Sequence, residues 1–321
     1  MARRRKSKYK KPVIFTSILV IAIFMATGYS LLSQTLKLEA EANLYASERY
    51  LWYQIINNHT SKNNGYFYEN QFESGKYSYI GNNSNNYISL DGDLWRIMSV
   101  EKDHTIKVVK TNNTMVYAFD EVNNRTDSST YCTQLENGCN SWASQISFTN
   151  SSLNGTVEND SSLLGYLNTT FYNSLSQDLK DKIVQHVFNI GSVSTTSTFS
   201  EAIIEEQEYT WEGYIGLPTL TEMLYPNNNI DITIGQSYDN NYLLDSSSGN
   251  ILWTITPVKN SSSLVWTVNY DKSQIGKIAS LSTETKDNVT YNFIAMPTMY
   301  LKDTVKLVDG DGSMLNPFTI E

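Results

Sequence analysis

Four glutamates crowd into one eight-residue stretch of this chain, EAIIEEQE, as Glu201, Glu205, Glu206 and Glu208. Glycoside hydrolysis uses two carboxyl groups about 5–9.5 Å apart, one as acid and the other as base or nucleophile. Clustered charges on a short segment are more typical of a solvated surface, and we expect that here. The sequence also lacks H-E-x-x-H, G-x-S-x-G, G-x-x-x-x-G-K and G-x-G-x-x-G. We therefore expect no enzyme activity and no cofactor, with a hydrolase that uses Glu205 or Glu206 as the alternative.

The segment DGDGS, from Asp309 to Ser313, invites comparison with a calcium loop. An EF-hand loop needs oxygen ligands at positions 1, 3 and 5 and glycine at position 6. Position 6 here is Met314. We expect a glycine-stabilised turn between two terminal strands and no metal site.

Aromatic side chains are the remaining candidates for a binding site. The chain has six tryptophans and 22 tyrosines. Trp95 and Trp253 lie in alternating apolar patterns that predict core positions. Trp142 and Trp211 lie in more polar contexts, and these two are the candidates for stacking against a sugar ring or another ligand.

The chain has two cysteines, Cys132 and Cys139, in the hydrophilic segment YCTQLENGC. A structural metal site would need two further ligands nearby, and none of the three histidines is close in sequence. Outside the cytoplasm neighbouring thiols tend to oxidise. We expect a local disulfide, with a nucleophilic Cys139 as the alternative.

The elements that must position these residues begin with two predicted helices. Apolar residues at spacings of three and four predict a helix over Leu163–Leu175, with Asp160 or Ser161 as the N-cap. Ser176 is the expected N-cap of a second helix over Gln177–Phe188.

Short strands dominate the rest of the region after residue 76. Thr219 and Glu222 form a capping box for a third, short helix, and Asp91-Gly92 predicts a hairpin. The expected strands cover 77–81, 87–90, 94–100, 105–110, 251–256, 264–270, 274–281, 289–301 and 305–308. The fold class is therefore α+β, mainly antiparallel, with two or three short helices.

The N-terminal region predicts a cellular address. Seven cations precede an uncharged, mostly apolar run from Val13 to Leu32, and about 20 helical residues span a bilayer core. The cations place the N-terminus in the cytoplasm and the rest of the chain outside. We expect an uncleaved transmembrane anchor. The alternative is secretion after cleavage at Ala26-Thr27-Gly28 or Ala40-Glu41-Ala42.

The predicted domain organisation follows from these segments. Residues 1–12 form a cytoplasmic basic segment and 13–32 the transmembrane segment or signal peptide. Residues 33–60 contain no glycine or proline, and we expect them to form a helical stalk. We expect residues 61–76 to form a linker. Residues 77–321 form one extracellular α+β domain.

The charge balance excludes one class of partner. The formal charge is −9, and without the seven N-terminal cations 17 basic residues face 33 acidic ones, a charge of −16. Nucleic-acid binding needs a basic face, so it is not expected. The expected partners are the membrane, through the single N-terminal helix, and a glycan or protein ligand.

Several segments together resemble an uncharacterised domain of Firmicutes surface proteins. They are YIG…NYISLDGDLWRIMSV, LLGYLNTTFYNSL, WEGYIGLPTLTEML, LWTITP and AMPTMYLKDTVKLVDGDGSMLNPFTI, which cover most of residues 79–321. The family typically carries N-G-x-x-W-R-I and an ending of the type V-R-P-V-x-Y-L-K … G-x-G-T-x-x-N-P-Y, but Met296-Pro297 stands here where Arg-Pro is usual. The resemblance implies a compact C-type-lectin-like surface domain that brings its chain ends together, and it implies no established activity.

These observations favour an extracytoplasmic surface protein whose large domain binds or adheres to a glycan or a protein. A structural subunit of a surface layer or appendage is one alternative, because a leader followed by a helix also suits fibre proteins. A cell-wall hydrolase is the other.

Overall fold

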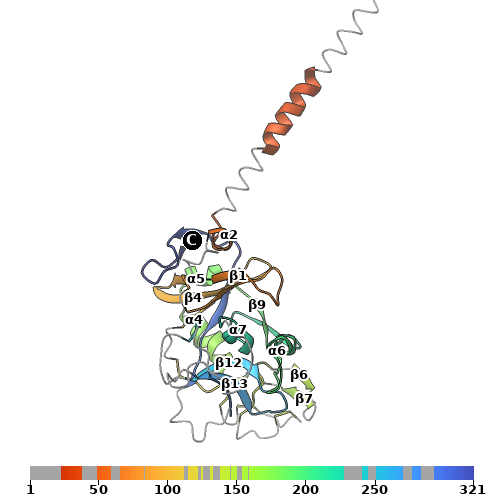
Figure 1. Cartoon of the computed structure of the whole chain (residues 1–321), viewed down its shortest axis with the longest axis vertical. Coiled ribbons are helices and arrows are strands. Elements are labelled where there is room, and N and C mark those ends of the chain that lie inside the picture. The colour runs from red at the N-terminus through yellow and green to blue at the C-terminus, as the bar shows by residue number, and fades with distance from the viewer. Residues whose placement is uncertain are drawn as a thin grey trace, which may run out of the picture. The chain divides into compact units, whose positions relative to one another are not determined.

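The computed structural model describes the chain in fifteen segments. They are residues 23–37, 49–58, 66–82, 84–111, 115–121, 124–125, 131–132, 138–144, 146–149, 154–157, 159–227, 241–244, 251–269, 277–282 and 293–321. Contacts divide the chain into two compact units, Met1–Arg49 and Tyr50–Glu321. Each unit is described by itself (Figure 1).

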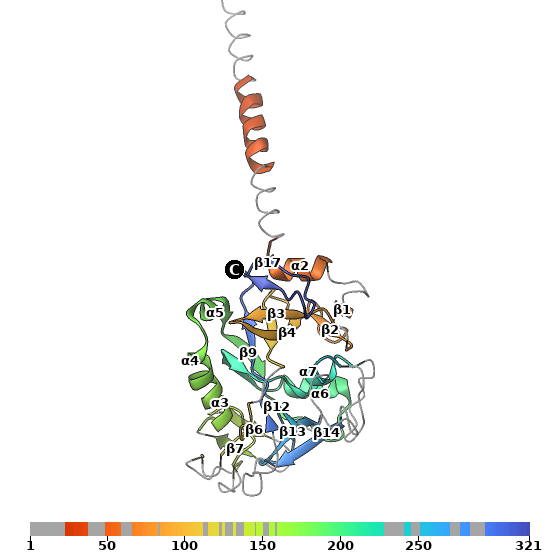
Figure 2. The same ribbon diagram turned by 90° about the vertical axis from the view of Figure 1, so that its left-hand side faces the viewer.

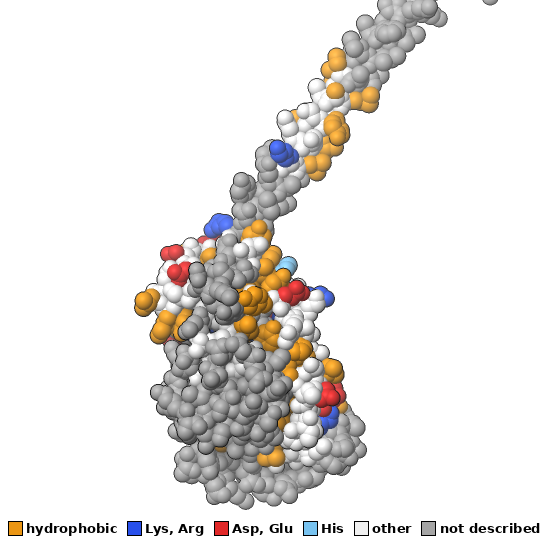
Figure 3. Space-filling view, in the orientation of Figure 1, with side chains coloured by type: hydrophobic (Ala, Val, Ile, Leu, Met, Phe, Trp, Pro, Cys, Tyr) orange, Lys and Arg blue, Asp and Glu red, His pale blue; other side chains and the backbone are white. Residues whose placement is uncertain are grey.

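In the first unit, residues 23–37 form a helix. The Thr27 and Thr35 hydroxyls donate to the carbonyls of Ile23 and Leu31, and apolar side chains cover much of the surface of this helix (Figure 3). Among the described residues, no helix is both long enough and apolar enough to cross a bilayer. Residues 1–22 lie outside the described part, so the segment Val13–Leu32 stays a prediction.

The second unit mixes short helices and strands. Its helices are α2 (Leu51–Asn58), α3 (Ser162–Tyr166), the π-helix η3 (Leu167–Phe171), α4 (Tyr172–Ser174), α5 (Gln177–Lys182), α6 (Phe199–Glu206) and α7 (Leu220–Leu224). Its first nine strands are β1 (Tyr66–Glu69), β2 (Tyr77–Ile80), β3 (Tyr87–Leu90), β4 (Asp93–Val100), β5 (Ile106–Val109), β6 (Ile146–Thr149), β7 (Asn154–Val157), β8 (Ile183–Val184) and β9 (His186–Asn189). The others are β10 (Thr210–Gly213), β11 (Ile215–Gly216), β12 (Ile251–Pro257), β13 (Leu264–Asn269), β14 (Lys277–Ser282), β15 (Phe293–Ile294), β16 (Thr298–Leu301), β17 (Leu307–Asp309) and β18 (Thr319–Ile320).

Two larger sheets organise this unit. The main sheet runs β1-β2-β4-β5-β16-β11, with β3 on β4 and β8 on β16, and its pairs are antiparallel. The second sheet runs β14-β13-β12-β15, where only the β12–β15 pair is parallel. Helices α6 and α7 lie between the two sheets in both views (Figures 1 and 2). The α+β, mainly antiparallel prediction is confirmed.

The unit begins and ends at the same place. Tyr50 forms a bridge with Lys306, and the Leu51 amide donates to the Val305 carbonyl at 2.9 Å. Helix α2 accordingly lies beside the C-terminus (Figures 1 and 2), and its Leu51 and Ile55 are 0% exposed in the core. The predicted stalk over residues 33–60 is therefore wrong at its C-terminal end, because α2 packs into the globular unit. The predicted linker over 61–76 is wrong at β1, which carries the buried Phe67 and pairs with β2.

The predicted helix over 163–175 is confirmed, but the one over 177–188 is wrong in its second half. Ser161 and Ser176 accept hydrogen bonds from Leu164 and Leu179 as N-caps. Helix α5 ends at Lys182, because Ile183 and Val184 pair with β16 and His186–Asn189 pair with β10. The apolar residues that suggested a longer helix are largely β-branched and fill strands instead.

Two glycine-containing connections lie where the sequence predicted turns. Asp91 and Gly92 have φ of 52° and 79° between the paired Leu90 and Asp93, as a two-residue hairpin loop requires. At the second turn, between β17 and β18, Gly312 has φ of 76°, and a Cβ there would lie 2.3 Å from the Asn85 carbonyl oxygen. Among the described residues, no cluster of three or more His, Cys, Asp or Glu is arranged to hold a metal ion.

A buried ion pair fixes the segment that leads into α3. Asp120 is 0% exposed, and its Oδ2 accepts from Arg125 Nε at 2.9 Å and from the Cys139 amide at 2.7 Å. Its Oδ1 accepts from the Ser162 amide at 3.1 Å. Arg125 also donates to the carbonyl of Ser141 at 2.6 Å. The Asp120 carboxylate therefore links the backbone at Cys139 to the first turn of α3.

Replacing Asp120 by Asn should destabilise the unit by about 3–5 kcal/mol, because it leaves the Arg125 charge buried without its counter-ion. Denaturant unfolding of the full chain measures this. The matched control is Asp93→Asn, since Asp93 pairs with Lys110 at 2.5 Å but keeps 58% of its side chain exposed. It should change stability by less than about 1 kcal/mol. Equal losses for the two variants would contradict the assigned role of Asp120.

Candidate functional site

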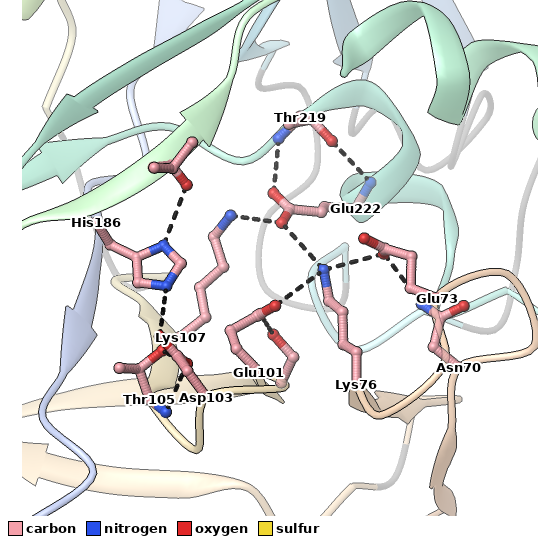
Figure 4. Close-up of polar contacts among 12 residues, drawn as sticks. Asn70, Glu73, Lys76, Glu101, Asp103, Thr105, Lys107, His186, Thr219 and Glu222 are labelled. Atoms are coloured by element: carbon pink, nitrogen blue, oxygen red, sulfur yellow. Dashed lines mark hydrogen bonds and ion pairs between the residues drawn. The ribbon is translucent and has the colours of Figure 1, made fainter.

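A network of buried lysines and half-buried carboxylates joins the main sheet to α7 (Figure 4). Lys107, on β5, is 2% exposed and its ammonium bonds to Glu222 Oε1. Lys76, immediately before β2, places its Nζ 3.8 Å from the same oxygen. A buried carboxylate needs partners of this kind, because desolvation otherwise drives it to its neutral form.

The capping box of α7 holds Glu222 in this position. Its Oε2 accepts from the Thr219 amide at 2.9 Å, and the Glu222 amide donates to Thr219 Oγ1 at 3.2 Å. Burial by itself would raise the pKa of Glu222, but Lys107 and Lys76 outweigh it, so the pKa is lowered. The carboxylate is therefore charged at neutral pH and serves the helix cap and the two lysines together.

Lys76 is shared among three carboxylates. Its Nζ lies 3.1 Å from Glu73 Oε2 and 3.5 Å from Glu101 Oε2, besides the contact with Glu222. Burial would lower the pKa of Lys76, but Glu101, Glu222 and Glu73 together raise it. With Lys107, the network holds two positive and three negative groups. Its charges are thus nearly balanced and engaged with one another.

The far edge of the network contains a histidine. The His186 ring stacks on Tyr300 with centroids 3.8 Å apart, and its Nε2 lies 3.3 Å from Asp103 Oδ2. Partial burial would raise the pKa of Asp103, but hydrogen bonds from Thr105 and the neighbouring His186 lower it. Lys107 Nζ lies 5.0 Å from the centroid of the Tyr300 ring, so an aromatic wall covers the lysine.

A cavity of about 30 Å³ opens beside this network. Charged, hydroxyl-bearing and aromatic side chains share its wall. They are Asn70, Glu73, Lys76, Ser78, Tyr79, Met98, Ser99, Phe199, Ile203, Thr221, Glu222, Tyr225, Pro226 and Tyr242. Aromatic walls with a few convergent polar groups are typical of ligand sites. We take this cavity as the candidate binding site.

The acidic segment identified in the sequence is not simply a solvated surface, and the expectation is wrong for Glu206. Glu206 is 2% exposed. Its carboxyl accepts from the Thr221 amide at 3.0 Å, from the Thr221 hydroxyl, and from Thr256 Oγ1 at 3.0 Å. Burial raises its pKa to about 7, which the hydrogen bonds from Thr221 and Thr219 only partly offset.

Its neighbour Glu205 takes different partners. Glu205 Oε1 accepts from Lys259 Nζ at 2.9 Å, and Oε2 accepts from Ser197 Oγ at 2.7 Å. Adjacent helical residues do not face each other, and here the two carboxyls bind to separate elements. The structure does not bring Glu205 and Glu206 together as a pair of catalytic acids. Glu201 forms the capping box of α6 with Thr198.

Neither of the two tryptophans predicted to stack on a ligand presents a fully exposed ring. Trp142 is 0% exposed and packs against Phe119 and Trp211. The expectation that Trp142 presents a face to a ligand is wrong, because that face is used by the core. Trp211, on β10, is half-buried and packs on Phe188. Neither lines the cavity. The predicted core positions of Trp95 and Trp253 are confirmed, since each is 1% exposed.

The disulfide between Cys132 and Cys139 is present, as predicted. Both residues are buried with Tyr131, and the Cys139 amide is held by Asp120. The disulfide therefore pins the segment that the Asp120–Arg125 pair also fixes.

Sequence reasoning missed most of the cavity. Lys76 and Tyr79 in its wall, and Lys107 in the neighbouring network, belong to no local motif. Among the wall residues, the sequence pointed to Glu222 through its helix cap. One signal was available: Lys107 stands between Ile106 and Val108 in a strand whose four residues are all buried. A lysine in such a strand requires a buried counter-ion.

Comparisons with protein-family models, with curated proteins and with solved structures found no match to this chain.

The raised pKa of Glu206 gives a pH-dependence of stability with a definite sign. The folded state favours the neutral carboxyl, so this residue's stabilising contribution is complete below pH 4.5 and is lost as the pH rises to about 7. Relative to Glu206→Gln, the stability of the natural protein should fall by roughly 3 kcal/mol over that interval. Denaturant unfolding at a series of pH values measures the difference.

The control for this prediction is Glu208→Gln, since Glu208 lies on the same segment but is exposed. Its pH profile should match that of the natural protein. Identical profiles for the natural protein and Glu206→Gln would show that Glu206 does not titrate in this range.

Proposed function

We propose that this protein is an extracytoplasmic surface protein whose globular unit binds a glycan or protein ligand. The observation that carries the proposal is the cavity beside the Lys76–Glu222 network. It combines the aromatic rings of Phe199, Tyr225 and Tyr242 with polar side chains. In ligand-binding sites, aromatic rings provide contact area for the ligand and a few polar groups fix its orientation.

The proposed location outside the cytoplasm has two supports. A basic cluster precedes the apolar run from Val13 to Leu32, which is the pattern of an anchored or exported chain. The Cys132–Cys139 disulfide suits an oxidising compartment. The strongly acidic remainder of the chain favours solubility and gives no reason to expect a nucleic-acid partner.

We further propose that the globular unit is C-type-lectin-like and is related to the Firmicutes surface domain that its motifs resemble. The pairing of Tyr50 with Lys306 supports this, because that resemblance implies chain ends that meet. The motif NYISLDGDLWRIMSV forms the β3–β4 hairpin. Residues 298–301 of the C-terminal motif pair with β5, so both motifs contribute to the main sheet.

A binding screen tests the proposal most directly. The full chain, purified in a non-glycosidic detergent, should bind at least one component of an array of cell-wall glycans and surface proteins. Tyr225→Ala, at the cavity wall, should weaken that binding at least about tenfold, which corresponds to about 1.4 kcal/mol. The matched control is Tyr214→Ala, because Tyr214 is also half-buried but stacks on Tyr172 away from the cavity. No bound component, or equal loss in both variants, would contradict the proposal.

A further inference from the structure

One side chain in the cavity wall carries a buried hydroxyl that has no partner. Tyr79, on β2, is 0% exposed and lines the cavity. Its OH makes no hydrogen bond within the described part of the chain. Buried polar groups are nearly always paired, so such a group is either a structural cost or a place where a ligand completes the site.

The hydroxyl is available as a neutral group. Burial and the neighbouring Tyr242 raise the pKa of Tyr79, and the opposing effect of Arg96 is smaller. The Arg96 guanidinium is directed to aromatic rings, 3.8 Å from the Tyr87 centroid and 5.0 Å from that of Tyr242. Tyr79 can thus donate one hydrogen bond and accept others at any physiological pH.

The ionic groups of the wall disfavour charged ligands. A cation entering the cavity would approach Lys76, and an anion would approach Glu73 and Glu222. These groups already pair with one another at 3.1 to 3.8 Å. Breaking such pairs leaves a buried charge uncompensated. The Ser99 hydroxyl already donates to Glu101, and the Asn70 side chain already bonds to Glu73 and to the Phe72 amide. The polar capacity that remains for a ligand therefore belongs chiefly to neutral hydroxyls, with the Tyr79 phenol foremost.

The volume of the cavity limits which ligand groups can enter it. A volume of about 30 Å³ accommodates one or two water-sized groups and excludes a whole sugar ring. Phe199 and Pro226 are buried in its wall, whereas Tyr225 is half-buried. A ring outside the cavity can pack on the exposed part of Tyr225 while a single substituent reaches inward.

We propose that this cavity receives a hydroxyl or hydroxymethyl group of a neutral sugar, which completes the hydrogen bonding of Tyr79 while the sugar ring packs against Tyr225. This inference rests on the proposed binding function and narrows its ligand class. Tyr79 is assigned as a contact that sets specificity for neutral, hydroxylated ligands.

The test compares two conservative substitutions. Binding of glucose, galactose, mannose and N-acetylglucosamine is measured by ligand-observed NMR on the full chain in a non-glycosidic detergent, with glucosamine and glucuronate as charged counterparts. At least one neutral sugar should bind more tightly than its charged counterparts. Tyr79→Phe should weaken it at least about tenfold and should not lower the thermal unfolding midpoint, because the lost hydroxyl has no protein partner.

Tyr131→Phe is the matched control. The Tyr131 hydroxyl is buried but donates to Asn140 Oδ1 at 2.8 Å, in the cysteine loop away from the cavity. This variant should lower the unfolding midpoint and leave sugar affinity unchanged.

Three outcomes would overturn the inference: no neutral sugar binds, charged sugars bind as tightly, or Tyr79→Phe binds as well as the natural protein. The array screen separates this failure from that of the proposed function. A glycan or protein ligand retained by Tyr79→Phe but lost in Tyr225→Ala would keep the function and reject the sugar contact. An array without any ligand would reject both.

Discussion

The carboxylate of Glu222 is the group on which the arrangement of the site depends. A charge buried between two layers is stable only if its partners are placed within hydrogen-bonding reach. Glu222 meets this condition through the Thr219 amide at the cap of its own helix, through Lys107 on β5 and through Lys76 immediately before β2. The pairing therefore fixes where α7 lies against β2 and β5. The cavity lies beside this pairing, and Lys76 and Glu222 both stand in its wall.

The same pairing determines the chemistry that the cavity offers. The lysines are engaged by Glu73, Glu101 and Glu222, so little net charge remains to attract an ion. The groups left for a ligand are aromatic faces and neutral hydroxyls. Glu206 is a further buried carboxyl beside α7 and accepts hydrogen bonds from Thr221 and Thr256. It connects α6, α7 and β12 and does not form an acid pair with Glu205. This arrangement accords with the proposed recognition of a neutral polar group.

Local features were predictable from the sequence, and features that depend on distant partners were not. The Ser161 and Ser176 caps, the Thr219–Glu222 capping box and the Asp91-Gly92 turn depend on a few neighbouring residues, and each was found. Residues 183–188 were expected to be helical because their apolar spacing fits the repeat of a helix as well as that of a strand. Pairing with β16 and β10 decides in favour of strands. Trp142 lies in a polar segment, but the Asp120–Arg125 pair draws that segment inward. The cavity itself combines residues from 70 to 242, so no local pattern could reveal it.

A double-mutant cycle between Lys107 and Glu222 tests the central claim most directly. Lys107→Met, Glu222→Gln and the double variant are compared with the natural protein by denaturant unfolding at neutral pH. If the buried pair organises the site, Lys107→Met leaves the Glu222 carboxylate without its nearest cation, and Glu222→Gln leaves the Lys107 ammonium without its carboxylate. The double change should then cost less than the sum of the two single changes by about 2 kcal/mol or more. Losses that add to within about 0.5 kcal/mol would show that the pair is not coupled and would contradict the account.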